Sequence, residues 1–404
     1  MEKKKTKWIR PRHAVITELA RLILTPYCRL RYRIRVEKFR QQGDRPYLIL
    51  YNHQTAFDQF FVGMAFRGPI YYMATEDIFS LGWLSKLLRW AVAPIPIRKQ
   101  TTDITAVMNC IKVAREGGTI CIAPEGNRTY SGKTLHMNPA IASMAKKLKL
   151  PIALYRIEGG YGVQPRWTDK LRRGNMRGFV SQVIEPEEYA SLSAEELMER
   201  ISRGLYTDEG KSEGLFRSKK QAEYLERCIY VCPQCGLSEF ESRGNEITCK
   251  KCGKTVRFGE NQRLSGVGFD FPYSFVGEWY EAQEAYMNAL DVTQLSSQPL
   301  YRDRARVSEV IVYQRKNLLR QEAEITLYGD RLVLDEGGEN ELSLPFSEVT
   351  AAACLGRNKL NIYHGKMIYQ FKGGKRFNAL KYVNLYFRHR HITRGEEHDQ
   401  FLGL

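Results

Sequence analysis

Three short apolar runs limit what the first half of the chain can fold into. They lie at 45–51, 118–123 and 151–155. Each has the length of one buried strand and is bounded by polar or turn-forming residues. A helical pattern with its apolar residues along one side fills 102–116, between the first two runs. This alternation predicts an α/β domain, in which a mixed sheet is flanked by helices.

The second half of the 404-residue chain has different periodicities. An aromatic helical stretch lies at 270–290. Short strands with turn residues between them are predicted at 309–313, 323–328, 331–334, 359–363 and 367–371, followed by a helix at 378–389. These strands predict a mainly antiparallel β domain that resembles a pleckstrin-homology-like barrel. We expect the α/β domain at 1–215, a linker and cysteine-rich unit at 216–262, a helical linker at 263–300 and the β domain at 301–404.

A histidine and an aspartate five positions apart directly follow the first apolar run. The segment 52–58 reads Asn-His-Gln-Thr-Ala-Phe-Asp. If Asp58 accepts a hydrogen bond from one ring nitrogen of His53, it fixes the tautomer and makes the other nitrogen more basic. Such a histidine can take the proton from an attacking hydroxyl. The spacing alone is not specific, and the alternative is a surface histidine beside an aspartate at a helix N-terminus.

A second polar segment follows the second apolar run and contains Glu125, Gly126 and Arg128. The carboxyl end of a strand in an α/β sheet is where ligands bind. An arginine there can hold a phosphate through two hydrogen bonds, and a glutamate can accept from ligand hydroxyls. Between the two segments, Arg98 ends the apolar stretch 94–97. Taken singly, each arginine is equally consistent with a plain surface residue.

Together these segments resemble the glycerolipid acyltransferase family, whose best-known members are the lysophosphatidic acid acyltransferases. Four blocks of that family occur in order at 52–58, 94–98, 124–128 and 150–155. The resemblance covers residues 15–210. It implies that His53 is the general base and Asp58 its orienting partner. It further implies a set of substrate-binding residues, namely Asn52, Arg98, Glu125, Gly126 and Arg128.

The resemblance implies an O-acyltransferase that uses an acyl thioester, on coenzyme A or an acyl carrier protein, and a lysophospholipid. The expected acceptor is 1-acyl-sn-glycerol-3-phosphate in phospholipid biosynthesis, and no organic cofactor is expected. The sequence departs from the family pattern at Thr55, Thr75 and Asn127, where Ser, Lys and Thr are commoner. Another lysolipid or a glycolipid acceptor therefore stays open. So does a non-enzymatic adaptor that binds membrane or nucleic acid on a degenerate acyltransferase fold.

Four of the nine cysteines form two Cys-x-x-Cys pairs, each followed by glycine. They are Cys232, Cys235, Cys249 and Cys252. This spacing suits a structural zinc ion held by four thiolates, with no open position for catalysis, as in a zinc ribbon. A redox disulfide or an iron–sulfur site is the alternative. The single cysteines are expected to be buried thiols.

The net charge of +17 favours polyanionic partners. Anionic lipid, phosphorylated substrates and nucleic acid all satisfy it, and nucleic acid is the least expected because the implied substrates are lipids. The segments 14–36 and 78–97 mix apolar and basic residues, which suits interfacial helices. The alternative is that these helices pack on the protein's own core. The sequence has no apolar run of about 18 residues and no signal-peptide pattern, so we expect a cytoplasmic protein, peripheral on the cytoplasmic face of a membrane.

Overall fold

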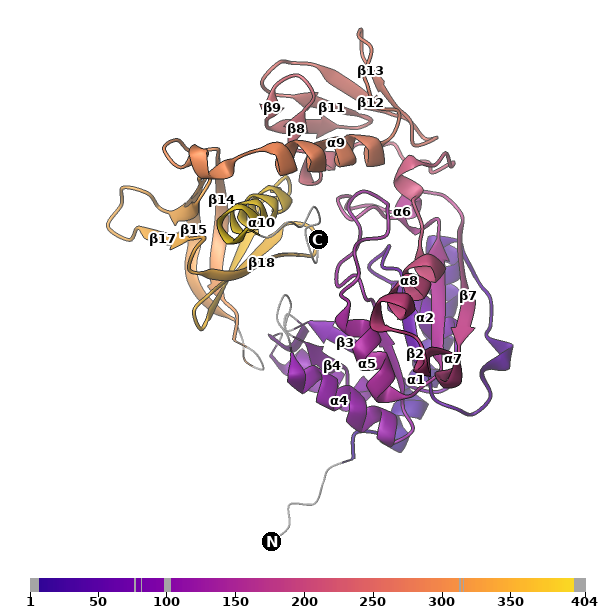
Figure 1. Ribbon diagram of the computed structural model, residues 1–404. Coiled ribbons are helices and arrows are strands. Elements are labelled where there is room, and N and C mark those ends of the chain that lie inside the picture. Colours follow the sequence, from indigo (N-terminus) through magenta and orange to yellow (C-terminus); the bar gives the residue numbers. More distant parts are fainter. Residues whose placement is uncertain are drawn as a thin grey trace.

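The computed structural model describes residues 7–75, 78–80, 82–97, 103–311, 314 and 316–395. Its first half is built on a seven-stranded sheet with the order β1-β7-β6-β2-β5-β3-β4 (Figure 1). The strands are β1 (Ile34–Val36), β2 (Leu48–Tyr51), β3 (Ile70–Thr75), β4 (Ile95–Ile97), β5 (Thr119–Ile122), β6 (Ile152–Glu158) and β7 (Met176–Ile184). Neighbours are parallel except for β6 and β7, which pair antiparallel. The expected mixed sheet is confirmed, and the three predicted strands are β2, β5 and β6.

Alternate residues of the central strands enter two separate cores. On β2, Leu48 and Leu50 pack with α4, α5 and α8, whereas Ile49 and Tyr51 pack with α1 and α2. The helices of this half are α1 (Pro11–Tyr32), α2 (Asp58–Ala65), α3 (Trp83–Val92), α4 (Ile104–Arg115), α5 (Ala140–Leu148), α6 (Gly160–Val163), α7 (Pro186–Ala190) and α8 (Ala194–Leu205). Because helices cover both faces, the central strands are apolar at every position. Among the described residues, no helix is long and apolar enough to cross a membrane.

The cysteine-rich unit is a small antiparallel structure joined to a long helix. Its strands are β8 (Val231–Cys232), β9 (Gly236–Leu237), β10 (Phe240–Arg243), β11 (Glu246–Cys249), β12 (Thr255–Phe258) and β13 (Leu264–Gly266). The predicted aromatic helix is α9 (Val276–Ala289). The Trp279 indole donates to the Val231 carbonyl at 2.9 Å, and the Gln283 side chain accepts from the Tyr230 amide at 2.8 Å. Helix α9 therefore fixes the strand that carries the first cysteine pair.

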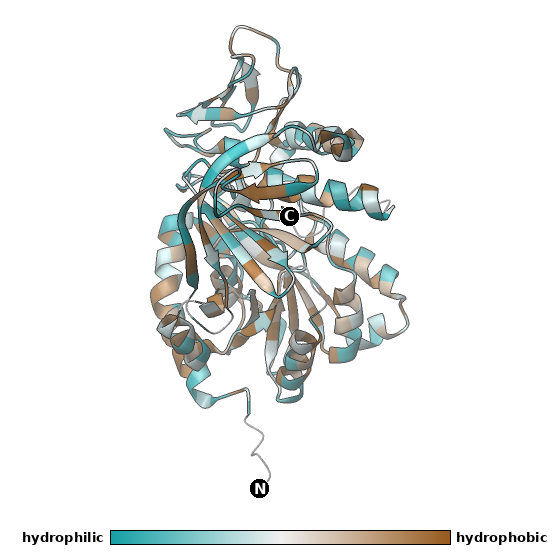
Figure 2. Ribbon diagram, turned by 90° about the vertical axis from the view of Figure 1, so that its left-hand side faces the viewer, coloured by the Kyte–Doolittle hydropathy of each residue, from teal (hydrophilic) through white to brown (hydrophobic). Residues whose placement is uncertain are grey.

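The C-terminal half is a seven-stranded antiparallel sheet with the order β17-β16-β15-β14-β20-β19-β18. It lies beside the α/β half in Figure 1 and in front of part of that half in the side view of Figure 2. The elements are β14 (Tyr301–Glu309), β15 (Asn317–Leu327), β16 (Arg331–Leu334), β17 (Leu342–Pro345), β18 (Val349–Leu355), β19 (Lys359–His364), β20 (Met367–Gly373) and α10 (Leu380–Arg394). The expected antiparallel sheet with a C-terminal helix is confirmed.

Two details of the C-terminal prediction are wrong. The strand expected at 309–313 is the end of β14, which begins at Tyr301 and ends at Glu309, while 312 and 313 lie outside the described residues. Strands β17 and β18 were not predicted. The centre of β18 is the alanine run 351–353, whose low strand propensity is overridden by complete burial against α10 and β19.

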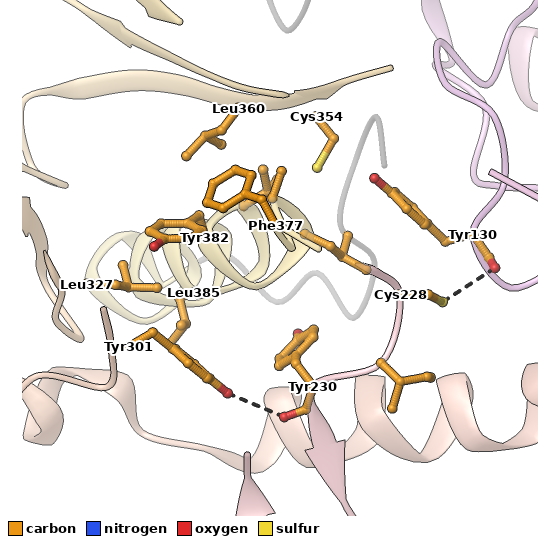
Figure 3. Packing of buried hydrophobic residues seen from close by; sticks show 14 of the residues in the cluster. Tyr130, Cys228, Tyr230, Tyr301, Leu327, Cys354, Leu360, Phe377, Tyr382 and Leu385 are labelled. Atoms are coloured by element: carbon orange, nitrogen blue, oxygen red, sulfur yellow. Dashed lines mark hydrogen bonds between the residues drawn. The ribbon is translucent and has the colours of Figure 1, made fainter. Parts of the chain in front are cut away.

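The linker expected at the start of 216–262 is anchored to the rest of the molecule at Arg227. Arg227 is 2% exposed, and its guanidinium donates to the carbonyls of Trp167 and Lys375 at 2.8 and 2.6 Å. One hydrophobic core extends from the α/β half into the C-terminal sheet. In it, Tyr130 of the α/β half lies near Cys354 of the sheet (Figure 3). The Cys228 thiol donates to the Tyr130 carbonyl at 3.5 Å. The two halves of the molecule are thus packed on each other.

Candidate active site

Two loops meet where β2 and β5 end. The strands are parallel neighbours, so their carboxyl ends lie at the same edge of the sheet. The main-chain amide of His53, after β2, donates to Glu125 Oε1 at 2.7 Å, and the Thr129 amide donates to the His53 carbonyl at 3.2 Å. The chain after β5 is therefore bonded to both polar main-chain atoms of His53. These contacts bring the two polar segments of the sequence into one site.

The His53 imidazole is held by a buried carboxylate. Its Nδ1 lies 2.8 Å from Asp58 Oδ2, and Asp58 is completely buried at the first residue of α2. Asp58 also accepts from the Gln54 amide at 2.7 Å and from the Thr55 hydroxyl at 2.6 Å. An ionised carboxylate can only accept hydrogen bonds, so Asp58 accepts from His53 Nδ1 as well. Nδ1 therefore carries the ring proton. His53 Nε2 is then the atom that can accept a proton.

The surroundings of His53 keep its imidazole neutral near pH 7. Burial lowers its pKa below the ordinary value of 6.5. The hydrogen bond to Asp58 opposes this shift, whereas the positive charges of Arg128 and Arg166 lower the pKa further. The His53 side chain is nevertheless 22% exposed to solvent. His53 therefore combines a free basic nitrogen with access from solvent.

Glu125 joins the two loops from inside the protein. It is 3% exposed, and its second oxygen accepts from the Leu135 amide at 2.7 Å. Burial raises its pKa to about 8, against the lowering effect of the two amide hydrogen bonds. Gly126 turns the chain after it at φ +69°, a conformation that favours glycine. With both oxygens bonded to main-chain amides, Glu125 shapes the site from beneath.

Arg128 is a buried cation with an unused donor. Its side chain is 9% exposed, and Nη1 is buried with no hydrogen-bond partner among the described residues. Burial, followed by the charge of Arg166, lowers its pKa to about 10. A buried guanidinium donor without a partner is rare and is satisfied by an anionic ligand. Arg128 is thus suited to bind an anion beside His53.

Asn52 does not have the substrate-binding geometry expected for it. It is completely buried, and its carboxamide exchanges two hydrogen bonds with the main chain of Ile157, at 2.9 and 2.7 Å. Its amide nitrogen also donates to the Thr207 hydroxyl at 3.3 Å. Both amide hydrogens are therefore used within the protein. Asn52 ties the end of β2 to β6 and positions the loop that carries His53.

Of the remaining expected site residues, Arg98 lies outside the described residues. Sequence reasoning missed Arg166, which follows α6 and is 2% exposed. It donates to the Arg128 carbonyl at 2.9 Å and to Asn127 Oδ1 at 3.3 Å, and its guanidinium lies 4.2 Å from the centre of the Tyr130 ring. Its only sequence signal is its place in the aromatic and polar stretch 164–168.

The four paired cysteines converge as their spacing predicts. The sulfur atoms of Cys232, Cys235, Cys249 and Cys252 all lie within 4.8 Å of one another. The glycines after the pairs, Gly236 and Gly253, have φ of +70° and +74° and turn the chain around the cluster. Four thiols in this arrangement could bind a metal ion.

Part of the chain is similar to a known family. Residues 32–157 match the family model described as Acyltransferase. We refer to this stretch, by its similarity alone, as the acyltransferase-family segment. The segment contains His53, Asp58, Glu125 and Arg128, and it ends with β6, before Arg166 and the cysteine cluster.

Two individual proteins are similar to this chain. The 1-acyl-sn-glycerol-3-phosphate acyltransferase of Bacillus subtilis (strain 168) is 23% identical over 137 residues, which are 34% of this chain and 65% of that protein. The match thus spans slightly under two thirds of the relative's length. The crystal structure of the 1-acyl-sn-glycerophosphate acyltransferase PlsC from Thermotoga maritima has a TM-score of 0.39 and 20% identity, covering 48% of this chain and 76% of that chain.

Proposed function

We propose that the chain is an O-acyltransferase that transfers a fatty acyl group from an acyl thioester to a lysophospholipid, with 1-acyl-sn-glycerol-3-phosphate as the acceptor in phospholipid biosynthesis. The observation that carries the proposal is the 2.8 Å contact between His53 and the fully buried Asp58, beside Arg128, whose Nη1 has no hydrogen-bond partner in the described part of the chain. The acyltransferase-family segment and the B. subtilis relative support the same chemistry.

In the proposed reaction, His53 Nε2 takes the proton from the acceptor hydroxyl as the oxygen attacks the thioester carbonyl carbon. The carbon–oxygen ester bond forms and the carbon–sulfur bond breaks. The protonated imidazole, which Asp58 stabilises, then returns the proton to the leaving thiolate. Arg128 binds the phosphate of the acceptor and positions its hydroxyl beside His53. No enzyme nucleophile is needed, because the acceptor is itself the nucleophile.

The test is mass spectrometry of the products formed by the purified chain from a mixed pool of lysolipids. Acyl-coenzyme A and acyl carrier protein are supplied in separate reactions, which identifies the donor. We expect the diacyl product of 1-acyl-sn-glycerol-3-phosphate to accumulate first. Acylation of a different lysolipid alone would change the acceptor and keep the chemistry. The absence of any acylated product with both donors would reject the proposal.

We also propose that the chain binds a membrane surface through α1 and α3. The two helices are in contact, because Arg12 donates to the Trp90 carbonyl at 2.9 Å and stacks on its ring. Apolar side chains are exposed on both, namely Val15, Leu19, Leu22, Ile23, Tyr27 and Leu30 on α1 and Trp83, Leu84, Leu87 and Trp90 on α3. Hydrophobic residues recur along the helices near the N-terminus in Figure 2. Aromatic and apolar side chains beside cations suit the interface of an anionic bilayer.

The membrane proposal is tested by sedimentation with vesicles of phosphatidylglycerol and phosphatidylcholine. The double variant Trp83→Ser, Leu87→Ser should bind several-fold less well, and equal binding to that of the natural chain would contradict the proposal.

The metal in the cysteine cluster is proposed to be zinc with a structural role, since four thiolates leave no open position. The division into parts at 1–215, 216–262, 263–300 and 301–404 is likewise proposed, with a pleckstrin-homology-like C-terminal part.

A further inference from the structure

The turn between β18 and β19 reaches the candidate active site from the C-terminal half of the molecule. Arg166 links them, since its guanidinium donates to the Cys354 carbonyl at 3.1 Å and to the Gly356 carbonyl at 3.4 Å. A third donor of the same guanidinium binds the Arg128 carbonyl. One side chain thus separates the turn from the main chain that carries Arg128.

The next residue of the turn, Arg357, is a cation at the border of the site. It is partly exposed, and its Nη1 lies 3.3 Å from Asp169 Oδ1. Asp169 already has a closer partner, because Arg227 contacts the same oxygen at 2.7 Å. The carboxylate is thus neutralised without Arg357. The guanidinium of Arg357 therefore has donors to offer to a further anion.

The position of the turn is fixed by packing. Cys354, the last residue but one of β18, is 1% exposed and faces Tyr130, which follows Arg128 by two residues (Figure 3). The C-terminal turn and the arginine-bearing loop after β5 therefore share one core. A turn that is held in this way can present a side chain at a defined place.

Four arginines form a cluster at this border of the site. Arg227 and Arg357 share one carboxylate, Asp169, while Arg166 bonds the main chain of Arg128 and of the turn. The charge of Arg357 reaches Arg128, whose pKa is lowered chiefly by burial and further by the charges of Arg166 and Arg357, while Asp58 opposes the shift. Such repulsion is relieved by a bound polyanion, and a phosphomonoester carries more negative charge than a phosphodiester.

We propose that Arg357, on the β18–β19 turn of the C-terminal sheet, binds the phosphomonoester of the acceptor together with Arg128. The inference rests on the proposed acyltransferase function and extends it. The C-terminal sheet then contributes a residue to substrate recognition. It makes the full site selective for an acceptor whose phosphate is unsubstituted.

The experiment measures acyl transfer by the full chain to 1-acyl-sn-glycerol-3-phosphate and to lysophosphatidylcholine. Three variants are compared: Arg357→Ala, Arg357→Lys and the control Arg306→Ala, an exposed arginine of the same sheet. We expect Arg357→Ala to raise KM for the phosphomonoester about tenfold, as for the loss of one charge-assisted hydrogen bond, with a smaller change in kcat. Arg357→Lys should restore part of the affinity, and Arg306→Ala should leave both constants unchanged.

Equal KM values in Arg357→Ala and Arg306→Ala would overturn the inference. An equal loss of kcat with both acceptors would also overturn it, because it would show a structural role. A separate measurement covers failure of the proposed function. If the natural chain transfers no acyl group, thermal stabilisation by inorganic phosphate still reports on the arginine cluster, and it should be weaker in Arg357→Ala than in Arg306→Ala.

Discussion

The sheet edge around His53 and the cysteine cluster both gather polar side chains from separate parts of the chain, but they leave different atoms free. At the sheet edge, the oxygens of Asp58 and Glu125 all accept hydrogen bonds from within the protein. Among the residues that the structure describes, His53 Nε2 and Arg128 Nη1 have no hydrogen-bond partner. In the cluster, all four sulfur atoms point to one place. A site that acts on a substrate retains unused capacity, whereas a structural site uses all of its ligands on one ion.

Metal removal should have the largest effect and should act on folding. Chelation at neutral pH is expected to unfold the cysteine-rich unit, because structural zinc sites contribute about 10 kcal/mol in small metal-binding units. Circular dichroism and metal analysis measure the outcome. The variant Cys110→Ala, at a buried cysteine outside the cluster, is the control and should retain its metal. An unchanged melting curve after chelation would show that the cysteine cluster holds no metal on which folding depends.

The variant His53→Ala should have the next largest effect and should act on chemistry. We expect a loss of acyl transfer of about 10³-fold or more, with the melting temperature nearly unchanged, because the removed group is a base rather than part of the core. The matched control is His364→Ala. His364 pairs with Glu348 at 3.0 Å on the C-terminal sheet and has a similar exposure of 26%. Equal activity in the two variants would contradict the role of His53.

The variant Asp58→Asn should lower both the stability of the protein and its acyl transfer. The amide has a single acceptor oxygen, so it cannot accept both from His53 Nδ1, which contacts Oδ2, and from the Thr55 hydroxyl, which contacts Oδ1. If the NH2 group faces the imidazole, His53 loses its fixed tautomer. We expect activity to fall by about 10²-fold and the melting temperature to fall as well. Measurement of both on one preparation decides the point. A fall in activity without any loss of stability would show that Asp58 is not needed for the loop.

Glu125 gives the smallest expected effect, a dependence of stability on pH. Its pKa is raised from 4.5 to about 8 in the folded protein, chiefly by burial. Its contribution to stability is therefore complete below pH 4.5 and is lost as the pH rises through 8. Thermal melting between pH 5 and 9 should show a steeper decline for the natural chain than for Glu125→Gln. Parallel curves would show that folding does not change the pKa of this carboxyl group.

The sequence predicted the parts of the fold that rest on local pattern. Strands β2, β5 and β6 are continuous apolar runs, and the pairing of His53 with Asp58 lies within one loop. Strand β18 was missed because alanine says little about strands. Arg166 was missed because three of its acceptors are main-chain carbonyls, at 128, 354 and 356, and any residue type can supply a main-chain carbonyl. Contacts of this kind arise only when distant segments are packed together.

Arg166 has a practical consequence for attempts to divide the chain. Its guanidinium spans the loop after β5 and the β18–β19 turn, so cutting the chain after residue 215 removes two of its acceptors. The fragment would hold a guanidinium that lacks two of its acceptors, near the base on which catalysis is proposed to depend. An isolated N-terminal fragment that proved inactive would therefore say little about the activity proposed for the intact chain. Deletion boundaries should be paired with replacement of Arg166 by a neutral side chain.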